Sequence, residues 1–209
     1  SENTDVKVLL SSDIPDEVCP GYKYFSKIDD KNDFFEEILK RIRELKDFDL
    51  LRTDRCISAY GLEGRCPFSD LDFIDLFLTI PFEMRRYPEG GEWIEKYLLR
   101  NAFQKGNYLP KEVLWRPKEA FSNGISHENR DWATIIKEYV DNLISDDEIM
   151  KYREIYDPIP PTKEAYWYRK VFENHYQGRG KFIPHYWMPN QKYCKVDDPS
   201  ARVISSSSD

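Results

Sequence analysis

The fold class of this chain is indicated by one segment near its start, Val6-Lys7-Val8-Leu9-Leu10-Ser11-Ser12-Asp13-Ile14-Pro15-Asp16-Glu17. Residues 6–10 are aliphatic and β-branched at the start, so they are predicted to form a short buried strand. Residues 11–17 are an acidic loop directly after it. Ligands of open α/β sheets bind at the carboxyl ends of strands, so these carboxylates are placed to hold a magnesium ion or to orient an amine. A solvated acidic turn is the alternative interpretation.

Helical patterns dominate the rest of the chain. Apolar residues at helical spacing, together with capping residues, predict helices over most of its length. These cover residues 30–46, 50–59, 69–78, 92–104, 110–115, 131–144 and 162–175, with a short helix after Ser145. Ser69-Asp70-Leu71-Asp72 is the predicted capping box of the third helix. We therefore predict a mainly α chain with one short strand from a parallel α/β sheet.

Composition excludes several classes of protein. The length of 209 residues fits one domain, and 40% hydrophobic residues with 15% aromatics exclude wholesale disorder. A net charge of −7 without a basic block argues against a nucleic-acid partner. No apolar run approaches the roughly 20 residues that span a bilayer. The four cysteines lack C-x-x-C spacing, so a zinc site is not expected, and reduced thiols in a cytoplasmic protein are the simplest interpretation.

A second informative segment is Leu114-Trp115-Arg116-Pro117-Lys118-Glu119-Ala120-Phe121-Ser122-Asn123-Gly124. It places Lys118 in a tight loop that has aromatic flanks and ends in glycine. A fixed cation on a short loop suits a phosphate or a developing oxyanion, because it offsets charge without reorganising water. Most surface lysines are merely solvated, so this segment alone is a weak signal.

The segments on either side of the Lys118 loop strengthen the indication that this loop has a function. Cys56–Phe68 precedes this loop and Thr162–Arg169 follows it. In that order and spacing, these segments resemble the synthetase domain of glutamine-hydrolysing asparagine synthetases. The resemblance runs from Val6 to about Arg202, and the segment His185–Pro189 is similar to the eukaryotic-type enzymes. It implies an α/β PP-loop (adenine nucleotide α-hydrolase-like) parallel sheet. We predict a domain over residues 1–198 and a disordered tail over 199–209.

The resemblance also implies an activity. In the family, ATP adenylates the side-chain carboxylate of aspartate, ammonia released from glutamine then amidates it, and magnesium is required. Lys118 matches the lysine that neutralises charge on the phosphates. Further residues match the ATP–aspartate site: Ser11, Asp13, Asp16 and Glu17, with Asp13 taken as catalytic and Asp16 as the candidate magnesium ligand.

Two arginines complete the set of candidates. Arg55 and Arg65, with Asp54 and Glu63, are predicted to form buried charged pairs that either shape the aspartate pocket or only fix the fold. Lys96 and Arg100, spaced as an i, i+4 pair, are interpreted as a solvated helix face.

The acidic loop departs from the family pattern Ser-Gly-Glu-Gly-Ser-Asp-Glu. Ser12 and Ile14 replace glycines, and a β-branched residue is expected to resist the positive φ that glycine allows. Asp13 is one methylene shorter than glutamate, and a displacement of about 1 Å can cost roughly 100-fold in rate. Pro15 removes a backbone N–H donor.

The sequence contains neither the Ser-Gly-Gly-x-Asp-Ser pyrophosphate loop nor the glutaminase domain of the family. Two hypotheses remain open. Either this is the C-terminal part of a working synthetase, completed by a missing N-terminal half or another chain, or it is a degenerate, non-catalytic scaffold for binding or interaction. By itself the chain is expected to be inactive. The apolar strand at residues 6–10 is expected to need a partner or to self-associate.

Overall fold

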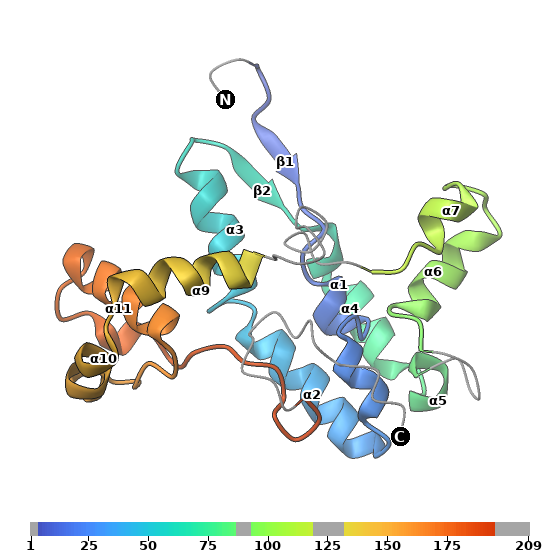
Figure 1. Cartoon of the computed structure of the whole chain (residues 1–209). Coiled ribbons are helices and arrows are strands. Elements are labelled where there is room, and N and C mark those ends of the chain that lie inside the picture. Colours follow the sequence, from blue (N-terminus) through green and yellow to red (C-terminus); the bar gives the residue numbers. More distant parts are fainter. Residues whose placement is uncertain (1–3, 87–92, 119–131, 195–209) are drawn as a thin grey trace. The chain divides into compact units, whose positions relative to one another are not determined.

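A computed structural model describes residues 4–86, 93–118 and 132–194 (Figure 1). The described chain falls into two compact units. The first comprises residues 4–118, except 87–92, together with 189–194, and the second comprises residues 132–188. The predicted domain boundary at 198 and the predicted tail lie outside the described residues.

The first unit contains both strands. In chain order its elements are β1 (Val8–Leu10), α1 (Pro15–Val18), η1 (Lys23–Lys27), α2 (Lys31–Glu44), α3 (Asp49–Ser58), β2 (Glu63–Arg65), η2 (Pro67–Ser69), α4 (Leu71–Thr79), α5 (Phe82–Arg85), α6 (Tyr97–Gln104) and α7 (Lys111–Leu114). The second unit is helical, with α9 (Trp132–Leu143), α10 (Asp146–Tyr152), η3 (Arg153–Ile155), α11 (Lys163–His175) and η4 (Gly180–Phe182).

The two strands pair in parallel, with Leu9 opposite Gly64. The N–H of Ser11 donates to the carbonyl of Arg65 at 2.8 Å, so the carboxyl ends of both strands lie side by side. The prediction of a mainly helical chain with a parallel strand is confirmed, but the sheet has two described strands rather than one. The second strand, Glu63–Arg65, lacks the apolar alternation that marks a half-buried strand.

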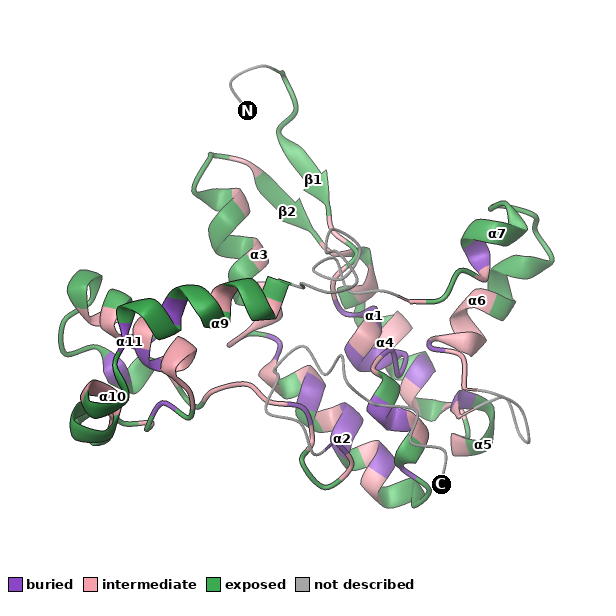
Figure 2. Ribbon diagram, viewed as in Figure 1, coloured by how far each residue is buried: buried purple, intermediate pink, exposed green. Residues whose placement is uncertain are grey.

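Strand β1 is exposed, as expected for this chain by itself, although its residue pattern is typical of a strand that is buried in a larger parallel sheet. Val8, Leu9 and Leu10 all keep large exposed fractions, with Leu10 at 77%. The only strand paired with it in the described residues is β2, which covers one edge. Its aliphatic side chains therefore face solvent (Figure 2).

Most predicted helices are confirmed, with shifted starts that their caps explain. Asp30 caps α2 by accepting from the N–H groups of residues 32 and 33. The cap of α4 is Asp70 rather than Ser69, because Ser69 belongs to the preceding 3₁₀ turn. Helix α6 begins at Tyr97 and not at residue 92, because Lys96 takes a left-handed conformation with φ of 58°.

The core of the first unit is built on α2, whose buried residues appear as separate purple segments in Figure 2. Phe34 and Ile38 of this helix are fully buried, as are Tyr24 and Phe25 of η1. A neighbouring cluster joins residues of the acidic loop and α1 to later helices: Ile14, Val18, Cys19, Leu45 and Phe77. Each large apolar side chain contributes about 1.5–3 kcal/mol when fully buried.

The segment 189–194 packs against the same helix and belongs to this unit. The side-chain amide of Asn190 donates to Oε2 of Glu37 at 2.7 Å. Lys192 and Tyr193 both bind the carboxylate of Asp33. These contacts join parts of the chain that are about 150 residues apart, as the separation of 153 between Asn190 and Glu37 shows.

The second unit packs α9 against α11. Val140, Ile144 and Tyr166 form its buried cluster. Thr162 caps α11 by accepting from the N–H of residue 165. Arg169 is buried and donates to Glu173 at 3.0 Å and to the carbonyl of Asp157 at 3.1 Å, so an arginine organises the interior of this small unit.

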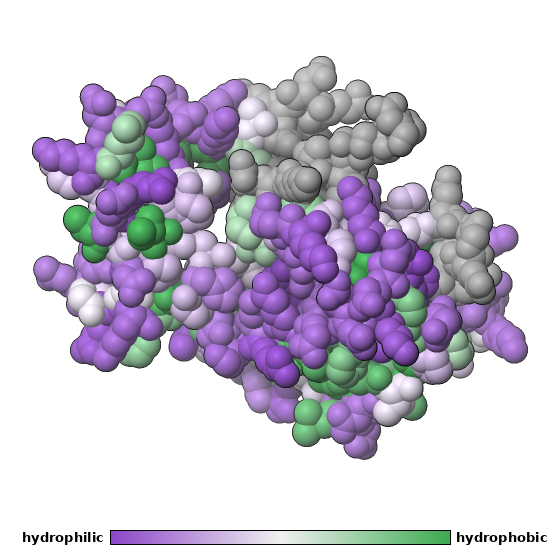
Figure 3. Space-filling model, turned by 90° about the horizontal axis from the view of Figure 1, so that it is seen from below, coloured by the Kyte–Doolittle hydropathy of each residue, from purple (hydrophilic) through white to green (hydrophobic). Residues whose placement is uncertain are grey.

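The face drawn in Figure 3 is mainly hydrophilic, and its hydrophobic side chains gather in separate small patches. Within the described residues, the helices are all too short or too polar to cross a bilayer.

Candidate functional site

The acidic loop places Asp13 just beyond the end of β1. Its Oδ2 accepts hydrogen bonds from the hydroxyls of Ser11 and Thr53, both at 2.6 Å. Thr53 comes from α3, 40 residues along the chain. Nearby, burial, together with the negative charge of Asp13, raises the pKa of the Cys66 thiol. Two of the predicted residues, Ser11 and Asp13, therefore lie together, and the Ser11 hydroxyl and Oδ2 of Asp13 already have partners inside the chain.

Ile14 takes a positive φ of 89°, although a β-branched side chain disfavours that region. The expected resistance of isoleucine to this conformation is therefore overcome in the folded chain. Its side chain is only 2% exposed and packs in the core cluster with Val18 and Phe77. Burial contributes about 1.5–3 kcal/mol, which offsets a backbone strain of about 1–3 kcal/mol. The loop thus keeps a backbone shape that glycine favours, without a glycine.

Pro15 is the first residue of α1, so its missing N–H falls where a helix leaves that group unpaired in any case. The carbonyl of Ile14 accepts from the N–H groups of Glu17 and Val18 at 3.0 and 3.1 Å. A short helix therefore begins inside the segment that the sequence predicts to be a loop, and it carries Asp16 and Glu17.

Asp16 gathers two lysines. Its Oδ1 lies 2.9 Å from Nζ of Lys96 and 3.0 Å from Nζ of Lys118. Burial alone would raise the pKa of Asp16, but the two ammonium groups together lower it below its ordinary value. Lys118 also donates to the carbonyl of Gly21 at 3.1 Å, and its Nζ lies 4.8 Å from the ring centroid of Tyr22. The structure thus brings Lys118 and Asp16 into direct contact.

Lys96 is a site residue that sequence reasoning missed, because its helical spacing with Arg100 favoured a solvated face. Neither residue is on such a face. Arg100 donates to the carbonyls of Glu95, Leu114 and Arg116 at 2.9, 2.7 and 2.8 Å. It therefore anchors the backbone that leads to Lys118. A basic residue that precedes a helix start is too common a pattern to have revealed Lys96.

Glu17 has an internal role. It is 4% exposed and accepts a hydrogen bond from the hydroxyl of Tyr22. Burial, together with the negative charges of Asp49 and Asp16, raises the pKa of Glu17 to about 7 in spite of that hydrogen bond. This carboxyl group is enclosed by the chain rather than presented to a ligand.

The two predicted arginines are exposed, so the expected buried pairs are wrong. Arg65 contacts Glu63 at 2.7 Å with 61% of its side chain exposed. Arg55 contacts Asp54 at 3.7 Å with 75% exposed. Their part in an aspartate pocket stays a prediction.

The surroundings of Asp16 do not fit a magnesium site. The described residues contain no group of three or more His, Cys, Asp or Glu side chains placed to hold a metal ion. Two ammonium groups already contact the Asp16 carboxylate and would compete with a cation. We therefore derive no step through a metal at this residue.

A parallel strand pair linked through helices, with charged residues beyond the strand ends, is the arrangement of α/β proteins that bind ligands at that edge. The family model for asparagine synthase matches residues 26–193. The chain is 46% identical to the asparagine synthetase (glutamine-hydrolyzing) of Gallus gallus over 204 residues, and 46% identical to that of Homo sapiens over 206 residues. These alignments cover 97% and 98% of this chain.

This chain therefore belongs to the asparagine synthase family. It spans 36% of the length of these relatives.

Proposed function

We propose that this chain is the C-terminal part of an ATP-dependent asparagine synthetase and supplies one wall of its synthetase site. The observation that carries the proposal is the cluster of Lys96 and Lys118 on Asp16, beyond the carboxyl ends of two parallel strands. Family membership supports it. In this proposal the strands belong to a PP-loop sheet, and the pyrophosphate loop and glutaminase domain come from the rest of the protein.

The chemistry needs charge neutralisation more than it needs a protein nucleophile. An oxygen of the aspartate side chain attacks the α-phosphorus of ATP, the bond to the bridging oxygen breaks, and pyrophosphate leaves with the electron pair. Ammonia then attacks the acyl carbon, AMP leaves, and a proton passes to solvent. Cations held in place stabilise the negative charge that builds on the phosphates in the first step.

The cluster is suited to that task. Two ammonium groups and one carboxylate leave a net positive charge, and both lysines are about three-quarters shielded from water. Asp16 keeps them close to each other before the substrate arrives, so less reorganisation is needed during reaction. In this proposal Lys118 is the catalytic lysine, and Lys96 is the second cation that faces the phosphates.

The test is a chimera in which this chain replaces the matching C-terminal 36% of the Homo sapiens relative. Aspartate-dependent pyrophosphate release is the measurement. Lys118→Ala is expected to lower kcat about 100- to 1,000-fold, the usual effect of removing a preorganised charge-stabilising group. Lys111→Ala, at an exposed lysine of α7, is the matched control. Full activity in Lys118→Ala would refute the proposal.

A non-catalytic scaffold is the second candidate function. It is favoured by the acidic loop, where Asp13 is bound by two hydroxyls and Glu17 by Tyr22. Under this alternative the chimera is inactive. Restoring the family loop with Ser12→Gly, Asp13→Glu, Ile14→Gly and Pro15→Ser then separates two causes. Recovered activity assigns the defect to the loop, whereas continued inactivity supports the scaffold.

The exposed apolar strand β1 also supports a partner. We propose that the N-terminal half of the family enzyme, or another chain, covers this strand, because exposed apolar strand edges favour association. We also propose that the protein is cytoplasmic.

A further inference from the structure

The ammonium group of Lys118 rests on the ring of Tyr22, and we propose that Tyr22 is the positioning residue for this lysine. Its ring and the Gly21 carbonyl beside it hold the ammonium next to Asp16. The inference rests on the proposed function only in giving Lys118 its catalytic importance. The positioning itself is a property of this chain.

Three groups within one short segment hold the lysine. Nζ of Lys118 lies 3.0 Å from Asp16, 3.1 Å from the carbonyl of Gly21 and 4.8 Å from the ring centroid of Tyr22. A lysine side chain is flexible and behaves as a point charge, so one ion pair does not fix its direction. A cation over a tyrosine ring adds a directional attraction, and it is stronger where water is partly excluded.

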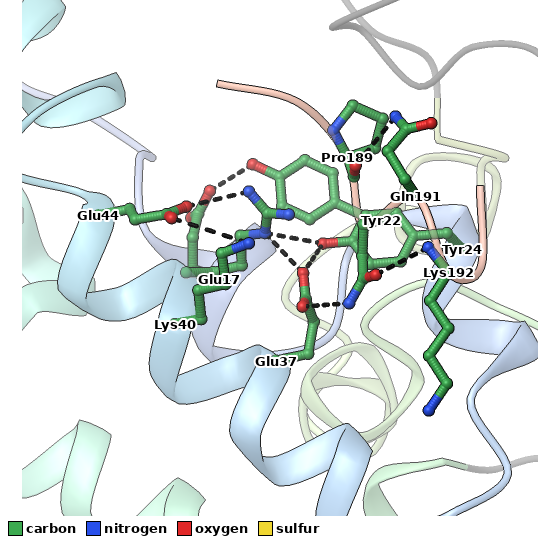
Figure 4. Close-up of polar contacts among 11 residues, drawn as sticks. Glu17, Tyr22, Tyr24, Glu37, Lys40, Glu44, Pro189, Gln191 and Lys192 are labelled. Carbon is green, nitrogen blue, oxygen red and sulfur yellow. Dashed lines mark hydrogen bonds and ion pairs between the residues drawn. The ribbon is translucent and has the colours of Figure 1, made fainter. Parts of the chain in front are cut away.

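The ring of Tyr22 is itself held. Its hydroxyl donates to buried Glu17, and its ring stacks on Tyr24 with centroids 5.8 Å apart and planes at 9° (Figure 4). Burial raises the pKa of the Tyr22 hydroxyl, so the phenol stays protonated and remains a donor. The ring therefore offers Lys118 a rigid surface.

Tyr24 links this surface to helix α2. Its hydroxyl donates to Glu37 at 2.7 Å (Figure 4). It also accepts from Arg41 at 3.0 Å, and both partners are buried. Because Arg41 also contacts Glu37 at 2.7 Å, the three side chains close a polar network in the core. The buried network therefore holds Tyr24 in place, and Tyr24 in turn holds the ring of Tyr22 that contacts the Lys118 ammonium.

Gly21 allows the close approach. A Cβ at this position would lie 1.9 Å from Oδ1 of Asp16 and 2.6 Å from Cε of Lys96. The backbone that presents the Gly21 carbonyl to Lys118 thus passes directly against the other two members of the cluster. Any larger residue would separate the carbonyl, the carboxylate and the ammonium.

The deciding experiment measures how readily the Lys118 amine is acylated in the full chain. The protein is treated with a trace of isotopically labelled acetic anhydride, and mass spectrometry compares Lys118 with exposed Lys31. Tyr22→Leu is expected to raise the relative rate about threefold to tenfold, because the lysine loses its cation–π contact. Tyr22→Phe keeps a ring face and should stay close to the original. Tyr60→Leu, at a tyrosine that is 73% exposed, is the matched control.

Circular dichroism confirms that each variant is folded before labelling. An unchanged rate in Tyr22→Leu, or equal rates in Tyr22→Leu and Tyr22→Phe, would overturn the inference. In the active chimera, Tyr22→Leu should lower kcat more than it changes KM, and Tyr22→Phe should rescue it. If labelling responds as expected but Lys118→Ala leaves the chimera fully active, the proposed function fails and the positioning role stands.

Discussion

The two lysines on Asp16 and the two arginines near β2 differ in how they obtain their partners. Lys118 contacts Gly21, 97 residues away, and its side chain is 24% exposed. Arg65 contacts Glu63 in the same strand, and its side chain is 61% exposed. The first partnership exists only when the chain is folded, whereas the second is available to an unfolded chain.

This difference decides what each pair can do. An exposed ion pair between near neighbours contributes about 0–1 kcal/mol, because solvent screens it and side-chain entropy opposes it. A cation held by contacts from another part of the chain has a fixed direction, and a fixed direction is what catalysis by charge requires. The contrast therefore favours the Asp16 cluster over Arg55 and Arg65 as the candidate site, because those two arginines are solvated in the described chain.

Glu17→Gln is expected to cause the largest change in the free energy of unfolding, and it tests how closely the Asp16 region is coupled to folding. The folded pKa of about 7 lies above the ordinary glutamate pKa of 4.5, so the folded state holds an extra proton between these pH values. Stability from this group is fully present below pH 4.5 and is lost as pH rises to about 7, by about 3 kcal/mol. Glu17→Gln should remove that loss. Urea unfolding at several pH values should therefore show the variant becoming more stable relative to the original protein as the pH rises. A parallel pH dependence in both proteins would show that Glu17 is not coupled to folding.

Gly21→Ala should cause the next largest change in the stability of the fold. The new methyl group would lie 1.9 Å from Oδ1 of Asp16, so the carboxylate or the backbone must move. Overpacking of this kind costs about 1–3 kcal/mol, and thermal unfolding measures it. Gly64→Ala in β2 is the matched control, because its methyl group would meet only the side chain of Ile57, at 3.2 Å. Equal losses in the two variants would remove the contrast between the regions.

Arg65→Ala should cause the smallest change in the stability of the fold. Its exposed pair with Glu63 predicts a change of about 0.5 kcal/mol or less in the free energy of unfolding, and weaker still in high salt. Chemical unfolding at low and high salt measures both quantities. A loss above about 1 kcal/mol would mean that the arginine has a partner the comparison overlooks.

Sequence reasoning found the parts of the molecule that local patterns encode. Helical spacing predicted both α2 and α11, and the structure confirms both helices, with Asp30 and Thr162 as their caps. Family resemblance pointed to Lys118 and Asp16 as candidates, and the structure brings them together.

The rest depended on contacts distant in sequence. Strand β2 forms because β1 lies beside it, since Glu63-Gly64-Arg65 has no strand pattern of its own. Lys96 reaches Asp16 because the chain turns through a left-handed residue before α6. The positive φ of Ile14 is imposed by burial of its side chain, against its local preference. Tertiary packing overrode local propensity in each case.

The contact between Asn190 and Glu37 has a consequence for synthesis on the ribosome. Helix α2 emerges early, but the amide that completes the hydrogen bonds of Glu37 belongs to a segment translated 153 residues later. At roughly 5–20 residues per second, that delay is on the order of ten to thirty seconds. During it Glu37 has Tyr24 and Arg41 but not Asn190, so the first unit reaches its final packing only after the whole second unit has been translated.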